Sequence, residues 1–565
     1  MIAYILILAP MLAALARGHA PARTRWLSPL WALAVTLLAG IALSILTAPL
    51  APHAGLQLAL TLPLCVLIGY AAGALLAGWR PSDAPMKLRR GAVVTAASPG
   101  GGAGGGGLTL AGVPIPRADE TKHFKLIGTT GTGKSTAIRE LLAAALHRGD
   151  AAIIADPDGG YLARFYDAAR GDVILNPFDG DARRWDLFSE ITHEYDVEQL
   201  ARSLIPDQGT DPTWSAYART LFSAVAQQLI ADGNRDDGEL YQMLTCAPRT
   251  ELRALLEATA AGPFLEAGNE KMFGSVRSVM TSALTALQYT TRQQAEPFSV
   301  RKWVRPAASA ANVPAVSLAP RGVLFLPYRA GEIAALRSVI SAWLRLAIFE
   351  AMDGDEGDRP LWFVIDELDA LGQIDGLKDA LARLRKFGGR CVLGLQSIAQ
   401  ASATYGRGTA ETIVENCGNT LILRCSASEH GGTAEFASRL IGQREIIYTQ
   451  RSSTRVPGKW RPSVTASEQL RSEPAVLASQ IERLPDLAGF LKLASVPDWQ
   501  SVTLTPSQEP TRPRVRRPSI LAPARASSPT SPTSPSSPNS PTASPAAAPK
   551  PSRRAASSTR ASVRK

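Results

Sequence analysis

The chain has 565 residues, of which 19% are charged, and it carries a formal net charge of +11. This length allows more than one domain. Residues 506–565 contain eleven Lys or Arg and one acid, so this segment accounts for +10 of the net charge and the remainder is near neutral. A uniformly basic, nucleic-acid-binding body is therefore excluded. The five cysteines form no C-x-x-C pair and have no His at ligand spacing, which argues against a zinc site or a disulfide framework.

The N-terminal region is apolar. Two uncharged runs, Leu27–Leu50 and Leu56–Trp79, are each long enough to cross the hydrocarbon core of a bilayer. Residues 1–90 are therefore predicted to form a transmembrane anchor. A further apolar run, Met1–Ala16, fits either a short third span or an interfacial segment; no positive region precedes it, which argues against a signal peptide.

The charges that flank these runs predict an orientation. Arginines precede the first confident run, basic residues follow the second, and the connector at 51–55 has no Lys or Arg. By the positive-inside rule the connector faces outward and the chain after the second run is cytoplasmic. We therefore expect a multi-pass protein of the bacterial inner membrane with a large cytoplasmic part. The basic residues concerned are Arg17, Arg23, Arg25, Arg80, Lys87, Arg89 and Arg90.

Residues 91–117 are predicted to form a glycine-rich linker. The stretch SPGGGAGGGG at 98–107 is too rich in glycine to hold regular structure, which is typical of a flexible tether. Without a strong strand-and-helix frame around it, this stretch is a weak candidate for phosphate binding.

A nucleotide-binding loop follows. The segment Phe124–Ile127 reads as a short strand, the next residues satisfy G-x-x-x-x-G-K-[ST], and apolar residues then recur at helical spacing. In such a loop, backbone N–H groups and a helix N-terminus bind phosphate, Lys134 neutralises the β- and γ-phosphates, and Ser135 offers its hydroxyl to Mg²⁺. The predicted ligands of ATP are Gly128, Thr129, Thr130, Gly131, Thr132, Gly133, Lys134, Ser135 and Thr136.

The strand signals stop after Asp172–Phe178 and resume at Gly322–Tyr328. Between them, from about Tyr195 to Val304, apolar residues recur with the helical period. The pattern predicts an all-α domain, residues 195–305, inserted between two parts of a nucleotide-binding domain, residues 118–194 and 306–505. Scattered arginines of this region fit ordinary surface charge better than a DNA contact, and nothing indicates base-specific reading.

An acidic pair follows an apolar strand at Leu361–Leu368. Asp366 and Glu367 come at the carboxyl end of that strand, which is where open α/β sheets bind ligands. Because a phosphate-binding loop lies upstream, Asp366 is predicted to hold the ligand shell of Mg²⁺. Glu367 is predicted to orient and polarise the attacking water.

A third strand, Cys391–Ser397, ends near Gln396. A glutamine at the tip of a strand beside the acidic strand can sense the γ-phosphate. The alternative is a polar residue that only caps the strand, and the sequence leaves both interpretations open.

The C-terminal segment, residues 506–565, has low complexity, with SPTSPTSPSSPNSPTASP near its middle. This composition cannot bury enough apolar area to offset chain entropy, so a disordered basic tail is predicted. Its arginines can bind nucleic acid, an acidic partner or the anionic membrane surface, and a solvated tail with no specific role is an equal alternative.

These motifs resemble the coupling proteins of type IV secretion and conjugation systems. The resemblance covers about Thr121 to Val502, and its most specific pieces are ADPDGG, DELDALGQIDGL and RKFGGRCVLGLQSIAQ. It implies a fold of the α/β class, a RecA-like P-loop NTPase with an inserted all-α domain, preceded by transmembrane helices and followed by the tail. It also implies a homo-hexamer with ATP sites at the subunit interfaces.

The resemblance assigns residues by position. It makes Lys134 and Ser135 the phosphate-loop pair, Asp366 and Glu367 the acidic pair and Gln396 the third motif. The family also has an arginine before the third strand, proposed to reach the neighbouring subunit's ATP. Arg385 holds the matching place, with an ordinary surface arginine as the alternative, and Arg424 is the next candidate.

The function implied is that of an ATP-hydrolysing coupling protein. It would recruit a relaxase–DNA complex and drive single-stranded DNA, bound without sequence specificity, towards a type IV secretion channel. The alternatives are a double-stranded DNA pump for chromosome segregation, an exporter of protein effectors only, and a nucleotide-gated docking receptor without turnover. Double-stranded DNA pumps of this kind usually carry a small C-terminal DNA-reading domain, whereas this sequence has a basic Ser/Pro-rich segment there. The presence of Glu367 argues against a receptor that does not hydrolyse ATP.

Overall fold

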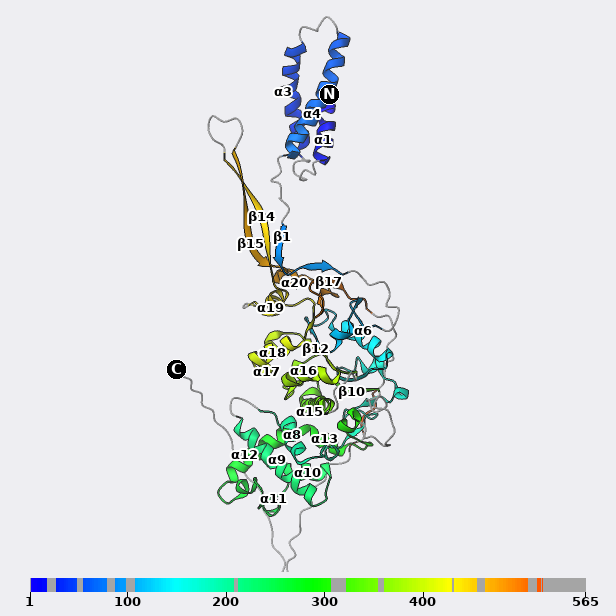
Figure 1. Cartoon of the computed structure of the whole chain (residues 1–565), viewed down its shortest axis with the longest axis vertical. Helices are drawn as coiled ribbons and strands as arrows, with labels where there is room; N and C mark the ends of the chain where they lie inside the picture. Colours follow the sequence, from blue (N-terminus) through cyan, green and yellow to red (C-terminus); the bar gives the residue numbers. More distant parts are fainter. Residues whose placement is uncertain are drawn as a thin grey trace, which may run out of the picture. The chain divides into compact units, whose positions relative to one another are not determined.

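The computed structural model of the chain shows two compact units, each considered separately below (Figure 1). Unit 1 comprises residues 1–176, 202–206 and 299–515, and unit 2 comprises residues 177–201, 207–298 and 516–565. The residues that the structure describes are 2–17, 27–47, 54–78, 87–97, 107–207, 212–305, 322–353, 360–428, 431–454, 463–506, 516–519 and 521.

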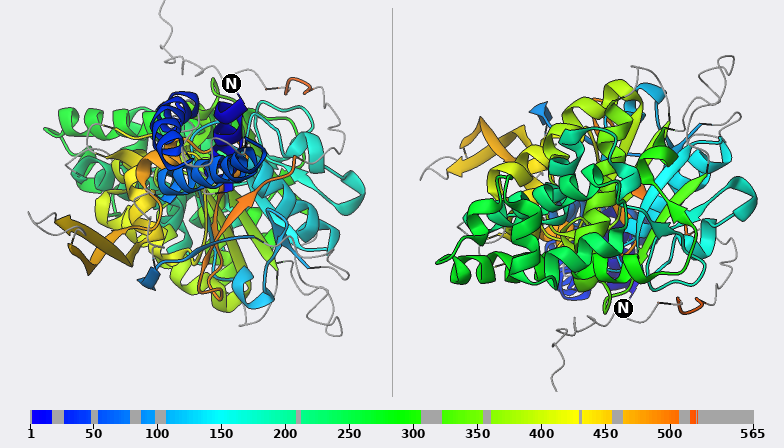
Figure 2. Two further views of the ribbon diagram at one scale, coloured as in Figure 1. Left: turned by 90° about the horizontal axis from the view of Figure 1, so that it is seen from above. Right: turned by 90° about the horizontal axis from the view of Figure 1, so that it is seen from below.

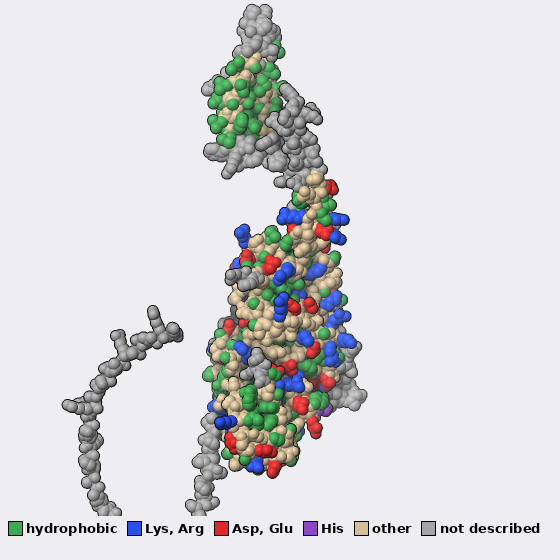
Figure 3. Space-filling view, turned by 90° about the vertical axis from the view of Figure 1, so that its left-hand side faces the viewer, with side chains coloured by type: hydrophobic (Ala, Val, Ile, Leu, Met, Phe, Trp, Pro, Cys, Tyr) green, Lys and Arg blue, Asp and Glu red, His purple; other side chains and the backbone are tan. Residues whose placement is uncertain are grey.

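Three apolar helices stand at the N-terminal end of unit 1: α1 (Ile2–Arg17), α3 (Ser28–Thr47) and α4 (Ala54–Gly78). Their described surface is almost entirely hydrophobic in Figure 3, and Leu38 and Leu75 are about three-quarters exposed. In α4, Ala59–Leu76 is long and apolar enough to cross a membrane, whereas the described apolar stretches of α1 and α3 are shorter. One span thus passes this test, and the second remains a prediction. The flanking Arg23, Arg25 and Arg80 lie outside the described residues.

Helix α1 packs closely against α4 through two glycines. A Cβ atom at Gly69 would lie 2.3 Å from the carbonyl oxygen of Ile7, and one at Gly73 would lie 2.5 Å from that of Met11. Small residues four apart let two helix backbones approach, as in helix pairs within membranes. The segment predicted either as a short span or as an interfacial segment is therefore a packed partner of α4.

The core of unit 1 is a ten-stranded sheet in the order β2-β17-β16-β13-β5-β12-β11-β6-β10-β7. The strands from β13 to β7 are parallel, as expected for buried, continuously apolar runs. These strands are β5 (Phe124–Ile127), β6 (Ala151–Pro157), β7 (Val173–Ile174), β10 (Val323–Tyr328), β11 (Leu361–Ile365), β12 (Gly389–Leu395) and β13 (Asn419–Ile422). β16 (Ala488–Lys492) and β17 (Trp499–Thr503) extend the sheet antiparallel.

Helices cover both faces of this sheet. Figures 1 and 2 show α16, α17 and α18 together on one side and α6 on the other. A parallel sheet needs this double cover because both of its faces are apolar. The helices are α6 (Lys134–His147), α15 (Ile333–Met352), α16 (Leu377–Arg383), α17 (Ile398–Tyr405), α18 (Arg407–Asn416) and α19 (Gly432–Ile441).

The predicted linker at 91–117 is wrong in part, because it contains three short strands within its described residues. Strand β2 (Val94–Ala96) pairs with β17, and β3 (Thr109–Leu110) pairs with β4 (Val113–Pro114). Just before it, β1 (Lys87–Gly91) pairs antiparallel with β14 (Gln443–Thr454), which forms a long hairpin with β15 (Ser463–Pro474). The partners of β1 and β2 are distant in sequence, so no local pattern indicates them. Residues 98–106 of the glycine tract lie outside the described residues.

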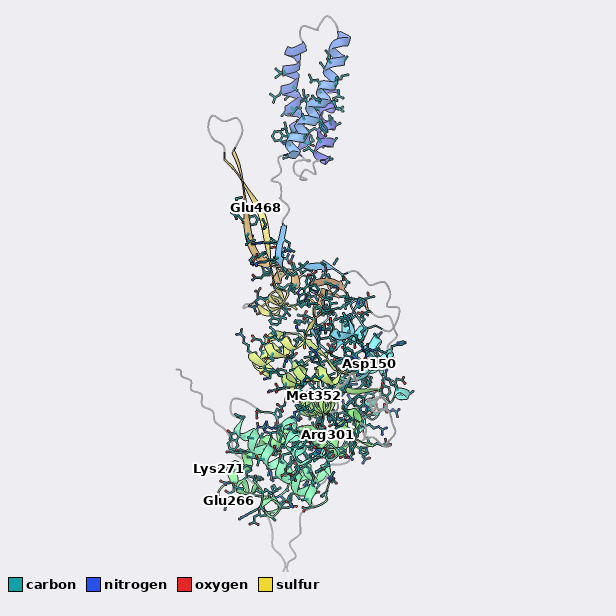
Figure 4. All side chains as sticks on the ribbon, in the orientation of Figure 1. Asp150, Glu266, Lys271, Arg301, Met352 and Glu468 are labelled. Carbon is teal, nitrogen blue, oxygen red and sulfur yellow. The ribbon has the colours of Figure 1, made fainter. Side chains whose placement is uncertain are left out.

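A buried ionic network lies at the amino edge of the sheet. The Arg148 guanidinium donates to both oxygens of Glu120, each at 2.8 Å, and to the Asp150 carboxylate. Arg390 donates to Glu120 at 3.0 Å, and the Trp362 indole donates to Asp150 at 2.9 Å. Figure 4 labels Asp150. Each carboxylate in the network is therefore matched by charged or polar donors.

Unit 2 is mainly helical, but it begins earlier than the predicted boundary at residue 195. It starts at Pro177 and includes a short parallel pair, β8 (Arg184–Trp185) with β9 (Pro297–Phe298), so it is not purely α. The pair has only two residues a strand, which is too short to show a strand pattern. The helices are α8 (Glu194–Leu204), α9 (Thr213–Ala231), α10 (Asp237–Thr245), α11 (Arg249–Leu256), α12 (Glu270–Ala283) and α13 (Thr285–Arg292).

The prediction of a wholly disordered tail is also wrong in part. Within 506–565 the structure describes residues 506, 516–519 and 521, and the last five of these belong to unit 2, where Pro518 and Leu521 form β-bridges. The rest of the predicted tail lies outside the described residues. The composition of residues 506–565 does not indicate this short segment, because the surrounding Ser, Pro and Ala residues dominate the average composition.

Candidate nucleotide-binding site

The predicted phosphate loop joins β5 to α6 at the carboxyl edge of the sheet. Two of its glycines have positive φ, 79° at Gly131 and 117° at Gly133, and Gly133 caps the N-terminus of α6. A side chain at Gly133 would also collide with Leu487, because its Cβ atom would lie 2.9 Å from that residue's Cδ2. The sequence thus folds into a turn that directs the first N–H groups of a helix outward, which is an anion-binding geometry. All nine predicted ligands, 128–136, lie in this turn and the first turn of α6.

Lys134 is held inside the loop. Its ammonium group donates to the carbonyl oxygens of Gly128, at 2.6 Å, and Thr129, at 3.2 Å. Burial lowers its pKa, and the nearby carboxylates Asp366 and Glu367 oppose that shift. Burial deprives the ammonium group of hydration. A bound phosphate would stabilise the charged form through its negative charge.

The side chains of Ser135 and Asp366, both predicted to bind Mg²⁺, are in contact. The Ser135 hydroxyl donates to Asp366 Oδ2 at 2.6 Å, and the Tyr161 hydroxyl donates to the same oxygen at 2.7 Å. The other oxygen, Asp366 Oδ1, is buried and has no hydrogen-bond partner within the described part of the chain. A buried carboxylate oxygen without a donor is what a bound cation requires, so these residues fit Mg²⁺.

The shortage of protein ligands around Asp366 agrees with this fit. The described ranges contain no group of three or more His, Cys, Asp or Glu side chains that could hold a metal. Mg²⁺ at phosphate sites typically takes one or two carboxylates and completes its shell with phosphates and water. Ser135 and Asp366 match the protein's usual share of such a shell.

Gln396 connects Glu367 to the phosphate loop. Its amide donates to Glu367 Oε1 at 2.6 Å and accepts from the Thr130 hydroxyl at 3.3 Å. This contact follows from strand order, since β12 lies between β5 and β11. Burial first, and then Asp366, raise the pKa of Glu367, while Lys134 and the Gln396 hydrogen bond lower it.

Gly394 allows the acidic strand to approach its neighbour. A Cβ atom there would lie only 1.9 Å from the backbone oxygen of Asp366, and the N–H of Leu368 donates to the Gly394 carbonyl at 3.1 Å. Any larger residue would push the acidic pair away from β12. The glycine in LGLQS therefore positions the carboxylates next to Gln396.

Two residues of this site were not predicted, Tyr161 and Asp156. Asp156 accepts the backbone N–H groups of Tyr161 and Leu162, at 3.0 and 2.7 Å, which fixes the turn that carries Tyr161. Burial raises the pKa of Asp156 to about 7. Arg139 stacks on the Tyr161 ring at 5.7 Å. The sequence marks ADPDGG, just before this tyrosine, only as a piece of the family resemblance, and the fold shows that Tyr161 contacts Asp366.

The two candidate arginines lie at opposite edges of the sheet. Arg385 belongs to the 3-10 turn Leu384–Phe387 before β12, and its charge helps burial lower the pKa of His123, the residue before β5, to about 4. This is the edge away from the phosphate loop. The Arg424 carbonyl, in contrast, accepts the N–H of Thr129 at 2.9 Å, and its guanidinium pairs with Asp486 at 2.6 Å. Within one chain, therefore, only Arg424 is next to the loop.

Comparisons with known proteins agree with this geometry. Residues 107–505 match the family described as "Type IV secretion-system coupling protein DNA-binding domain". The chain is 32% identical to "Coupling protein TraD" of Escherichia coli (strain K12) over 413 residues, which are 72% of this chain and 55% of that protein. The chain spans about half the length of the curated relatives it matches.

Solved structures of plasmid coupling protein TrwB share the fold. The structure in complex with ADP and Mg²⁺ has a TM-score of 0.64 and 31% identity, covering 76% of this chain and 97% of that one. The structure in complex with the non-hydrolysable ATP analogue ADPNP has a TM-score of 0.65 and 31% identity, covering 78% and 98%. With its phosphate loop, acidic pair and strand order, the chain therefore belongs to the family of type IV secretion-system coupling proteins.

Proposed function

We propose that this site binds ATP with Mg²⁺ and hydrolyses it. The observation that carries the proposal is the contact between Ser135 and Asp366, with Asp366 Oδ1 buried and without a hydrogen-bond partner among the described residues. The relatives whose structures hold ADP with Mg²⁺ and ADPNP support it. When bound, the metal ion would neutralise charge that develops on the transferred phosphoryl group.

The residues of the chain then have distinct roles. Ser135 and Asp366 hold the cation, and Lys134 binds the β- and γ-phosphates. Glu367 orients the attacking water and accepts its proton. Its raised pKa lies closer to neutral pH, which makes the carboxylate a better proton acceptor. Gln396, bonded to both Glu367 and the phosphate loop, reports the state of the γ-phosphate to the sheet.

The work coupled to hydrolysis is proposed to be conjugative transfer. The family match and the named relatives TraD and TrwB support a coupling protein that binds DNA. We propose that it recruits a relaxase–DNA complex and drives single-stranded DNA through a type IV secretion channel. The apolar N-terminal helices, of which α4 can cross a bilayer, support an anchor in the bacterial inner membrane with the nucleotide site on the cytoplasmic side.

A homo-hexamer with shared ATP sites would explain the place of Arg385. This arginine lies on the edge of the sheet opposite the phosphate loop of its own chain, so it can serve only a neighbour's nucleotide. In mixed oligomers, subunits that carry Glu367→Gln should restore activity to subunits that carry Arg385→Ala. Failure of this rescue, with hydrolysis lost in Arg424→Ala subunits and not restored by Glu367→Gln subunits, would transfer the role to Arg424 acting on the nucleotide of its own chain.

The deciding experiment measures ATP hydrolysis by the full-length chain in lipid vesicles. The rate is measured without DNA, with single-stranded DNA and with double-stranded DNA of equal length, and Glu367→Gln protein serves as the control. Stimulation by single strands supports the coupling function, and stimulation by duplex alone would indicate a double-stranded DNA pump. ATP binding without hydrolysis under all three conditions would reduce the protein to a nucleotide-gated receptor.

A further inference from the structure

A short piece of the C-terminal segment is seated on unit 2. The Arg517 carbonyl accepts the N–H of Gly180 at 2.8 Å, and the N–H of Ser519 donates to the Phe178 carbonyl at 3.3 Å. Antiparallel bridges join Asp179 to Pro518 and Gln293 to Leu521. The described residues of this segment, Arg516–Ser519 and Leu521, are therefore attached to unit 2 through backbone hydrogen bonds and two isolated bridges.

The surface beneath the segment is acidic, and its charges match. Arg516 Nε lies 3.8 Å from Asp179 Oδ2, and that carboxylate is 1% exposed. Arg517 Nε lies 3.5 Å from Asp181 Oδ1 at a more exposed position. A carboxylate buried beside a strand position favours a basic residue there, because an unpaired buried charge is costly. Backbone pairing thus supplies attachment, and the acidic residues supply selectivity for basic sequence.

The local shape also suits an extended strand. A Cβ atom at Gly180 would lie 2.9 Å from the Pro518 carbonyl oxygen and 3.1 Å from the Arg517 Cβ, so glycine permits the close approach. The buried Gln293 side chain donates to the Ala182 carbonyl at 3.3 Å, which ties the two sides of the surface together. Pro518 lacks an N–H and suits an edge position, where none is needed.

We propose that residues 178–182 and Gln293 form a docking site for an extended basic peptide, and that residues 516–519 and 521 of the same chain occupy it. Seven further Lys or Arg follow Leu521 in the sequence. The docked segment therefore attaches the start of this basic stretch to the helical unit 2. The inference does not depend on ATP hydrolysis.

Disulfide cross-linking of the full-length chain tests the pairing. Gly180→Cys with Arg517→Cys places two Cβ atoms close to the separation that a disulfide requires, about 3.5–4.5 Å. Cys246→Ser is included because Cys246 is the exposed native thiol. Mild oxidation should give a cross-link within one chain, whereas the matched pair Gly180→Cys with Arg553→Cys should not. Equal cross-linking of both pairs, or only cross-links between chains, would overturn the proposal.

Hydrogen exchange provides a second test that needs no new cysteine. In the full-length chain, Arg516→Glu with Arg517→Glu should speed amide exchange at 178–182 by about tenfold, because the N–H of Gly180 loses its acceptor. The control replaces another adjacent arginine pair of the same tail, Arg553→Glu with Arg554→Glu, and should leave this exchange unchanged. Unchanged exchange in the first variant, or the same change in both variants, would contradict docking by residues 516–521.

Discussion

The two edges of the central sheet treat buried charge in opposite ways. At the amino edge, Glu120 accepts two hydrogen bonds from Arg148 and one from Arg390, and Asp150 accepts hydrogen bonds from Arg148 and Trp362. At the carboxyl edge, one buried oxygen of Asp366 has no donor in the described part of the chain, and burial raises the pKa of Glu367.

This difference separates stability from function within one fold. Charges that are fully matched cost little to keep buried, whereas a charge left without a partner is retained at the expense of stability. Perturbed ionisation and unpaired polar atoms gather where a ligand is to bind. We therefore expect substitutions at the carboxyl edge to change chemistry and substitutions in the buried ionic network of the amino edge to change folding.

The largest effect should come from Glu367→Gln. Loss of the general base should lower the rate of ATP hydrolysis by roughly 10²–10⁴-fold, with nucleotide binding retained. Lys134→Ala should also abolish turnover, but through the loss of phosphate binding. Steady-state hydrolysis and fluorescent-nucleotide titration measure the two properties. Undiminished hydrolysis by purified Glu367→Gln protein would remove this residue from the mechanism.

Glu120→Ala should act on stability instead. Removing this carboxylate takes away the buried negative charge that pairs with both Arg148 and Arg390, which should cost about 3–5 kcal/mol of unfolding free energy. Thermal or denaturant unfolding measures the loss, and hydrolysis per folded molecule should stay within about twofold. A variant that keeps its stability but loses activity would erase the contrast between the two edges.

Tyr161→Phe sharpens the comparison within the carboxyl edge. The substitution removes the hydroxyl that donates to Asp366 Oδ2 and keeps the buried ring. Outer contacts to a metal ligand typically contribute about 10- to 100-fold in metal affinity or activity. The Mg²⁺ concentration for half-maximal hydrolysis should rise accordingly. A lowered maximal rate at unchanged Mg²⁺ dependence would show that Tyr161 does not act through Asp366.

The smallest effect concerns pH. Glu367 must be ionised to accept a proton, so activity should fall as the pH falls through its raised pKa. Gln396→Ala removes a hydrogen bond that lowers this pKa, which should move the acidic limb of the rate profile upward by about half to one pH unit. A limb that stays in place, or moves to lower pH, would contradict the role of Gln396 beside Glu367.

Much of the carboxyl edge could be predicted from sequence because its signals are local. The phosphate loop, the acidic pair and Gln396 each follow a short apolar run, and parallel strands bring their carboxyl ends together. Tyr161 could not be predicted in the same way. A single tyrosine after a glycine turn has no periodic pattern, and its contact with Asp366 spans 205 residues.

The regions predicted wrongly share a different cause. Strand β1 contains three basic residues, which were interpreted only as charges flanking a membrane helix. Residues 516–521 lie in a segment whose average composition predicts disorder. In both cases a partner far along the chain decides the structure, as with Arg90 and Glu445, which are 355 positions apart. Such pairing is invisible to any window of sequence.

The pairing of β2 with β17 also sets an order of events during synthesis. Thr95 contacts Trp499 across 404 positions, so β2 leaves the ribosome long before its partner exists. At about 5–20 residues per second, this interval lasts roughly 20–80 s. Strands that wait for distant partners fold slowly and expose edges that can pair wrongly. Strand β2 is thus among the first parts of the domain to be synthesised. Its pairing with β17 is among the last contacts that can form.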